Sequence, residues 1–150
     1  ASNADGHYIL SPETPMQAAA DFWQAISESL AIKDFGVIVT DSHSTLMRRG
    51  VTGFSIGWCG FKPFYSYKGQ PDIYGHPLEH TLLNVPDSLA GCGVYAMGEG
   101  DEQTPLAVIR GAEKIIFSND PVTAEERKMF FLSMDEDIYA PILQSAAWQE

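Results

Sequence analysis

Apolar residues early in the chain recur with the period of an α-helix. The stripe consists of Ala19, Phe22, Trp23, Ile26 and Leu30. Residues with these three- and four-residue spacings share one face of a helix, so the stripe predicts an amphipathic helix. Thr14 is a suitable N-cap for this helix. Pro15 suits the first helical position, because a backbone N–H there would have no partner within the helix and proline has none.

Two runs of strand-forming residues follow this helix. Residues 35–40 are apolar and mostly β-branched, which predicts a buried strand that ends at Asp41. Residues 51–59 predict a second strand, interrupted by Gly53 and Gly57. Glycines inside a strand often mark a bulge or the close approach of another backbone, so we expect one or the other here.

The rest of the chain carries shorter patterns. A capping box of Thr123 and Glu126 predicts a helix to about Ser133, and a last helix is expected from Asp135, broken near Pro141. The other expected elements are a short strand at 7–10, a loop at 61–80, a helical pattern at 78–97 with its start at Pro86, an acidic loop at 98–105 and short strands at 106–110 and 114–117. Helices that alternate with short strands predict an α/β domain, with α+β as the alternative, in which helices flank a mixed sheet. No repeat or linker interrupts the sequence, so residues 1–150 are expected to form a single domain.

The charge balance narrows the range of partners. The chain has 150 residues, of which 20 are acidic and 9 basic, and a net charge of −11. Nucleic acids and anionic membranes repel such a chain, whereas divalent cations, or a nucleotide bridged by a metal, are compatible with it. Simple solubility explains the charge equally well. The two cysteines lack a metal-binding spacing, and the sequence shows neither a signal segment nor an apolar run near the ~20 residues of a membrane span. We therefore expect a cytoplasmic protein.

Asp41 is the most informative single residue. It ends an apolar run, and residues 42–45 are all polar. A carboxylate there projects from a rigid element into a site built by loops, and the hydroxyl groups beside it suit hard cations such as magnesium or manganese. Asp-Ser-His-Ser is also good turn chemistry, because these side chains bond to nearby backbone groups. From local sequence alone, the turn is the simpler interpretation.

Two further groups of residues could bind a ligand. Arg48 and Arg49 precede Gly50, and paired guanidinium groups can hold phosphate oxygens, although an ion pair at a strand edge is the alternative. Residues 97–104 contain three carboxylates and two glycines between a predicted helix and a predicted strand. Close carboxylates repel one another unless a cation compensates them, although a solvated acidic loop is the commoner outcome.

Taken in order, these segments are similar to those of one enzyme family. The similar motifs are Gly36-Val-Ile-Val-Thr-Asp-Ser42, Arg48-Arg49-Gly50, Gly53 with Ile56-Gly57-x-x-Gly60, Lys68-Gly-Gln-Pro-Asp72, Met97-Gly98-Glu99 and Pro105-Leu-Ala-Val-Ile-Arg-Gly111. The chain thereby resembles the coenzyme F-420:L-glutamate ligases, or γ-glutamyl ligases, from Ser2 to about Gly111. An ordered series over about a hundred residues is far more specific than any one motif.

The resemblance implies a reaction and a set of site residues. The family joins glutamate to the carboxylate of a deazaflavin precursor through an acyl-phosphate, with GTP, or ATP as the alternative here, and Mg or Mn as divalent metal, and its proteins are typically homodimers. It implies that Asp41 binds one metal and that Ser42, where the family usually has threonine, helps to bind a second. It also implies that Glu99 is a further metal ligand. It implies nucleotide contacts by Asn3 and by the 97–104 loop, with Met97, Gly98, Gly100 and Thr104. Arg48 and Arg49 are added as phosphate ligands on the basis of their own chemistry. No catalytic side chain is implied.

The chain also departs from the family. Ligases typically read Asp-Thr-Phe-Gly-Arg-x-Trp-Arg where this chain reads Asp41-Ser-His-Ser-Thr-Leu-Met-Arg48. The resemblance further implies a longer N-terminal part, with one acidic metal ligand immediately before Ala1, so the chain is expected to be the C-terminal part of such a ligase and impaired on its own. The alternative to a ligase fragment is a non-catalytic dimerisation or regulatory ligand-binding domain derived from this family.

Overall fold

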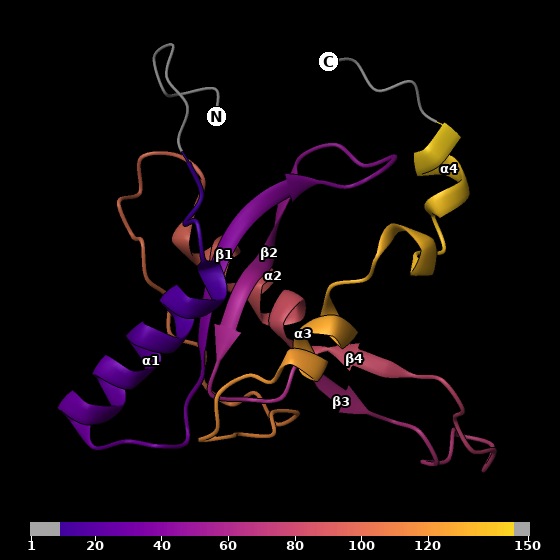
Figure 1. Cartoon of the computed structure of the whole chain (residues 1–150), viewed down its shortest axis with the longest axis horizontal. Helices are drawn as coiled ribbons and strands as arrows, with labels where there is room; N and C mark the ends of the chain where they lie inside the picture. Colours follow the sequence, from indigo (N-terminus) through magenta and orange to yellow (C-terminus); the bar gives the residue numbers. More distant parts are fainter. Residues whose placement is uncertain (1–9, 146–150) are drawn as a thin grey trace.

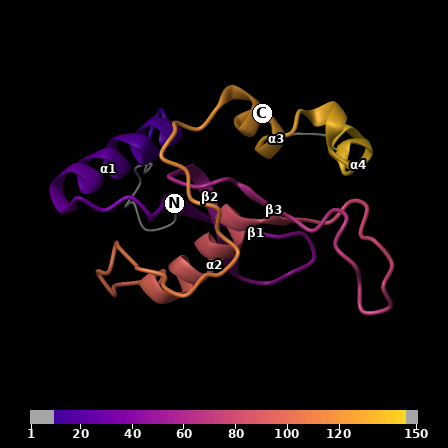
Figure 2. The same cartoon turned by 90° about the horizontal axis from the view of Figure 1, so that it is seen from below.

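A long antiparallel hairpin forms the centre of the molecule, with one helix on each face (Figures 1 and 2). The computed structural model describes residues 10–145. The hairpin consists of β1 (Val37–Ser44) and β2 (Val51–Cys59). Helix α1 (Pro15–Leu30) covers one face and α2 (Val85–Met97) covers the other. These elements carry the candidate site.

The ladder between β1 and β2 contains one irregularity. Val39 pairs with Gly57 and Thr40 with Ser55, so Ile56 is an extra residue on β2. Such a bulge changes which face of the sheet the following side chains occupy. As a result, Gly53 faces α2 while Gly57 faces α1.

Both strand glycines allow close packing of the helices. A Cβ at Gly57 would lie 2.5 Å from the carbonyl oxygen of Pro15, at the start of α1. A Cβ at Gly53 would lie 2.5 Å from Cγ2 of Val94 and 2.6 Å from the carbonyl oxygen of Ala90, both in α2. The expectation of close backbone approach at these glycines is therefore confirmed.

Helix α1 is the predicted first helix, but its buried face is narrower than the stripe. Ala19 is fully buried and packs with Val37 and Cys59, and Trp23 lies beside this cluster. Phe22 and Leu30 are exposed, because only the side of α1 that touches the hairpin is covered. The helix begins at Pro15 as expected, although the Thr14 side chain makes no capping hydrogen bond.

A second, smaller sheet extends away from the hairpin (Figure 1). It pairs β3 (Phe64–Ser66) with β4 (Leu82–Asn84), antiparallel. The expected loop at 61–80 and helical pattern at 78–97 are therefore wrong in part, since the chain makes two short strands before α2 begins at Val85. Residues 82–84 form a strand because they pair with β3, a contact that local sequence does not show.

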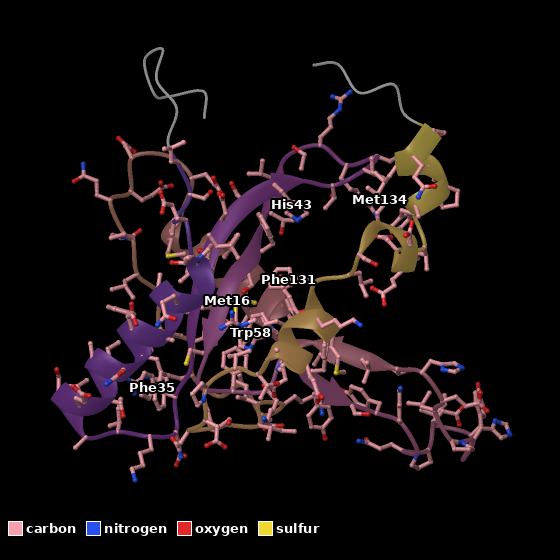
Figure 3. All side chains as sticks on the ribbon, viewed as in Figure 1. Met16, Phe35, His43, Trp58, Phe131 and Met134 are labelled. Carbon is pink, nitrogen blue, oxygen red and sulfur yellow. The ribbon has the colours of Figure 1, made fainter. Side chains whose placement is uncertain are left out.

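The C-terminal segment packs aromatic rings against the hairpin. It contains α3 (Ala124–Phe130), the 3₁₀ turn η1 (Met134–Glu136) and α4 (Ala140–Ser145). Trp58 is fully buried, its ring centroid lies 4.5 Å from that of Phe130 and 6.1 Å from that of Phe131, and Met16 packs beside it (Figure 3). The expected capping box at Thr123 is present.

Several expectations for this segment are corrected. Residues 106–110 and 114–117 form no strands; Phe117 makes a single bridge to Phe61, and Leu106 and Val108 are exposed with no neighbouring strand. The helix expected from Asp135 is instead a 3₁₀ turn followed by α4. Pro141 does not break α4, because it lies in the first turn, where its missing N–H is tolerated.

The predicted combination of helices and strands is confirmed in its α+β form. Every strand pairing within residues 10–145 is antiparallel, in two two-stranded sheets. The strand expected at 7–10 lies outside the described residues, apart from Leu10, which is not in a strand. Among the described helices, none has the length and apolar character needed to cross a membrane.

Candidate functional site

An open pocket lies where the second half of β1 meets the C-terminal end of α2 and the loop that follows. Its volume is ≈ 550 Å³. The lining residues are Thr40, Asp41, Ser42, Val94, Met97, Gly98, Glu99, Gly100, Glu102, Gln103, Thr104 and Pro105. The charged residues in this lining, Asp41, Glu99 and Glu102, are all acidic, which favours a cation over a free anion as ligand.

Ser42 is directed toward α2 by the pleat of the hairpin. It pairs with Gly53, whose Cβ position faces Val94 and Ala90 of α2, and paired residues share one face of a sheet. The Ser42 hydroxyl donates a hydrogen bond to Oε2 of Glu99 at 3.2 Å. This contact joins two segments that lie 57 residues apart in sequence.

Asp41 lies on the other face of β1. Successive residues of a strand alternate between faces, so the Asp41 side chain is on the face opposite to Ser42. The residue is exposed, and its Oδ1 accepts a hydrogen bond from the backbone N–H of Ser42 at 2.7 Å. His43 shares the face of Asp41, and its ring meets that of Phe54 edge-on at 4.6 Å (Figure 3).

The interpretation of residues 41–44 as a turn is wrong. These residues continue β1 and pair with residues 51–54 of β2. The chain reverses later, at residues 45–50, where Met47 and Gly50 have φ angles of 58° and 93°. Pairing with β2 satisfies the backbone groups that a turn would otherwise satisfy locally.

The loop after α2 is held by its own side chains. Helix α2 ends at Met97, and its C-cap, Gly98, has a φ of 84° and donates its N–H to the carbonyl oxygen of Val94 at 2.9 Å. The backbone N–H of Gly100 donates to Oε2 of Glu102 at 2.8 Å, and the Thr104 hydroxyl donates to the carbonyl oxygen of Met97 at 2.5 Å. Backbone N–H groups of Glu102 itself and of Gly100 hold the pKa of the Glu102 carboxyl below its ordinary value.

The structure brings most of the expected site residues together. Those that line the pocket are Asp41, Ser42, Met97, Gly98, Glu99, Gly100 and Thr104. Arg48 and Arg49 do not line it, because they lie in the turn between β1 and β2. Asn3 lies outside the described residues.

Sequence reasoning did not single out Glu102 among the three acids of its loop. Its backbone contact depends on how the loop turns at Gly98 and Gly100. A glutamate that follows two closely spaced glycines was the available signal, since glycines free the backbone to form such a turn.

The donor set suits a hard cation that keeps part of its water shell. Ser42 and Glu99 supply two neighbouring oxygen atoms, and oxygen is the ligand that magnesium and manganese prefer. In residues 10–145, no three Asp, Glu, His or Cys side chains converge as a metal cage. Magnesium is commonly bound by one or two carboxylates together with water and substrate phosphates, so the two-oxygen arrangement fits that kind of site.

Comparison with known proteins identifies the family of this chain. The sequence matches the family described as F420-0:gamma-glutamyl ligase over residues 1–111. The chain belongs to the F420-0:gamma-glutamyl ligase family. The match includes every residue that lines the pocket, whereas α3 and α4 lie beyond it.

Its relatives include three proteins named Coenzyme F420:L-glutamate ligase. It is 40% identical to that of Archaeoglobus fulgidus over 74% of this chain and 45% of the relative. It is 36% identical to the protein of Methanopyrus kandleri over 73% of this chain and 44% of the relative. It is 34% identical to the protein of Methanocaldococcus jannaschii over 79% of this chain and 49% of the relative. The chain therefore spans less than half the length of these curated relatives.

Proposed function

We propose that this chain supplies one cation-binding and nucleotide-contacting part of a γ-glutamyl ligase, an enzyme that forms an amide between an amino acid and a carboxylate substrate. The observation that carries the proposal is the hydrogen bond between Ser42 and Glu99. It joins two motifs that lie far apart in sequence, and it does so inside a pocket whose charged groups are all carboxylates. The names of the relatives support L-glutamate as the amino acid.

The two faces of β1 divide the metal ligands. Ser42 and Glu99 would hold one divalent cation, Mg or Mn, on the α2 side of the hairpin. Asp41, on the other face, would contribute to a second. A bound cation would neutralise phosphate oxygens and polarise the transferred phosphoryl group. Without cations, the acidic pocket would repel the nucleotide.

The reaction proceeds in two transfers. The γ-phosphoryl group of GTP or ATP passes to an oxygen of the substrate carboxylate, which yields an acyl-phosphate and a nucleoside diphosphate. The deprotonated amine of glutamate then attacks the acyl carbon, the bond from this carbon to the phosphate oxygen breaks, and inorganic phosphate leaves. The proton of the amine passes to solvent.

The nucleotide would lie along the loop after α2. Met97, Gly98, Gly100 and Thr104 line a pocket of ≈ 550 Å³, which is in the usual range for small-ligand sites. Arg48 and Arg49, exposed in the turn after β1, would hold phosphate oxygens, and Asn3 would add a further contact.

Calorimetric titration of manganese and GTP into the complete gene product tests the proposal. We expect Glu99→Ala and Asp41→Ala each to weaken manganese binding tenfold or more, on the order of the loss seen when metal-site groups are removed. Glu113→Ala is the control, because Glu113 is exposed and forms no side-chain bond within the described part of the chain. Manganese binding unchanged in both site variants would refute the assignment.

A further inference from the structure

Glu102 occupies an unusual position within the loop after α2. Its carboxylate folds back over the turn formed by Gly98, Glu99 and Gly100. Its Oε2 accepts the N–H of Gly100 at 2.8 Å. A Cβ built on Gly98 would overlap the same carboxylate group. The side chain therefore contacts the backbone on both sides of Glu99.

The two glycines make this arrangement possible. Gly98 has a φ of 84°, a conformation that other residues rarely adopt, and the absence of a side chain leaves room for the Glu102 carboxylate. The loop has a second internal restraint in the bond from Thr104 to the carbonyl oxygen of Met97. Between these restraints, Glu99 directs Oε2 toward the Ser42 hydroxyl.

We propose that Glu102 is a positioning residue for the cation site: its carboxylate holds the Gly98–Gly100 turn so that Glu99 faces Ser42. The inference rests on the proposed function, since it takes Glu99 as a cation ligand. Glu102 acts as a hydrogen-bond acceptor for the backbone and is not itself a ligand. Groups that orient a metal ligand commonly change affinity by 10- to 100-fold when they are removed.

The distinguishing test compares two substitutions of Glu102 in the complete gene product. Glu102→Ala removes the acceptor, and we expect manganese affinity measured by calorimetry to fall about tenfold. Glu102→Gln keeps an oxygen that can accept the Gly100 N–H, so its affinity should stay within about threefold of the wild type. Glu113→Ala is the control for Glu102→Ala, since both remove the charge and side-chain atoms. Glu113→Gln is the control for Glu102→Gln, since both remove the charge alone.

A purely structural role is separated by thermal unfolding without metal. Glu102 is exposed, so we expect both Glu102 variants to unfold within about 2 °C of the wild type, as is usual for surface substitutions. Equal affinities of Glu102→Ala and the wild type would overturn the proposal. Equal losses in Glu102→Ala and Glu102→Gln would also overturn it, because they would make the charge, and not the hydrogen bond, decisive.

Gly98→Ala gives an independent route to the same effect, because its methyl group would displace the Glu102 carboxylate. The double variant Gly98→Ala/Glu102→Ala should bind manganese no more weakly than Gly98→Ala alone, whereas full additivity would contradict the proposal. Glu99→Ala separates the two hypotheses. If it leaves affinity unchanged, the proposed cation site fails; if it weakens binding and Glu102→Ala does not, only the positioning role fails.

Discussion

Gly53 connects the candidate site to the packing of the hairpin. It pairs with Ser42, and its lack of a side chain lets Ala90 and Val94 of α2 lie against β2. The distance between α2 and β1 sets how far Glu99, just beyond the end of α2, is from the Ser42 hydroxyl. A residue with no chemistry of its own therefore determines whether two candidate ligands meet.

Gly53→Ala should destabilise the protein by about 1–3 kcal/mol, because the new methyl group would meet a backbone carbonyl that cannot move without shifting α2. Urea-induced unfolding followed by circular dichroism measures this difference.

Gly91→Ala is the matched control. Gly91 lies in α2, and an added Cβ there would have ordinary contacts of 3.7 and 3.8 Å. Because alanine has a higher helix propensity than glycine, this variant should be more stable than the wild type by about 0.5–1 kcal/mol. Equal stability of Gly53→Ala and the wild type would show that α2 does not depend on the missing side chain.

At the level of elements, α3 is short and depends on its cap. It has seven residues, none of them fully buried, and its contact with the core is made by Phe130 against Trp58. Thr123 and Glu126 form a reciprocal capping box, and the Lys62 ammonium lies 2.8 Å from Oε1 of Glu126. This network joins α3 to the segment that follows β2.

The capping network predicts a loss of stability in acid. Burial raises the pKa of Glu126, but hydrogen bonds from Lys62 and Thr123 outweigh burial, so the pKa lies below its ordinary value of 4.5. A carboxyl with a lowered pKa in the folded state stabilises the fold above the pKa of the unfolded state, and this contribution disappears as the pH falls through the folded value.

Glu126→Gln should therefore be less stable than the wild type by about 1 kcal/mol at pH 7, and the difference should shrink as the pH falls through the lowered pKa of Glu126. Thermal unfolding between pH 7 and pH 3 measures it. Glu125→Gln is the control, because Glu125 is exposed in the same turn and makes no side-chain bond in the described structure. A difference between Glu126→Gln and the wild type that does not change with pH would exclude this linkage.

The course of β1 was only partly predictable. Its apolar half, up to Thr40, is evident from the run of β-branched residues. Residues 41–44 carry polar side chains suited to a turn, and they become a strand because residues 51–54 are available to pair with them. Local propensity is weaker than a complete ladder of backbone hydrogen bonds, which only the folded hairpin provides.

At the scale of the whole molecule, many large apolar side chains remain exposed. Met47, Ile73, Tyr95, Leu106 and Val108 are each at least two-thirds exposed. Stable association buries about 800 Å² on each partner, and exposed apolar side chains are its usual source. The homodimer expected from the family resemblance stays a prediction. The exposed apolar side chains give a physical reason to expect it, because a dimer interface could bury them.

Light scattering on the complete gene product tests the oligomeric state. We expect the mass of a dimer across micromolar concentrations, and a dimer held by apolar contacts should persist in salt that screens the charge of −11. The mass of a monomer at every concentration would contradict the prediction.

The sequence by itself determined the helix after Thr14, the strand at 51–59, the capping box of α3 and the family, because each of these depends on local spacing or on an ordered series of motifs. It also indicated Asp41, Ser42 and Glu99 as candidate ligands through the resemblance. Only the tertiary structure decided that β1 extends to Ser44, that Ser42 and Asp41 lie on opposite faces, that Arg48 and Arg49 lie outside the pocket and that Glu102 closes the turn around Glu99. These features follow from strand register, from the extra residue in β2 and from the close approach of α2 at Gly53, all of which arise between segments far apart in the chain.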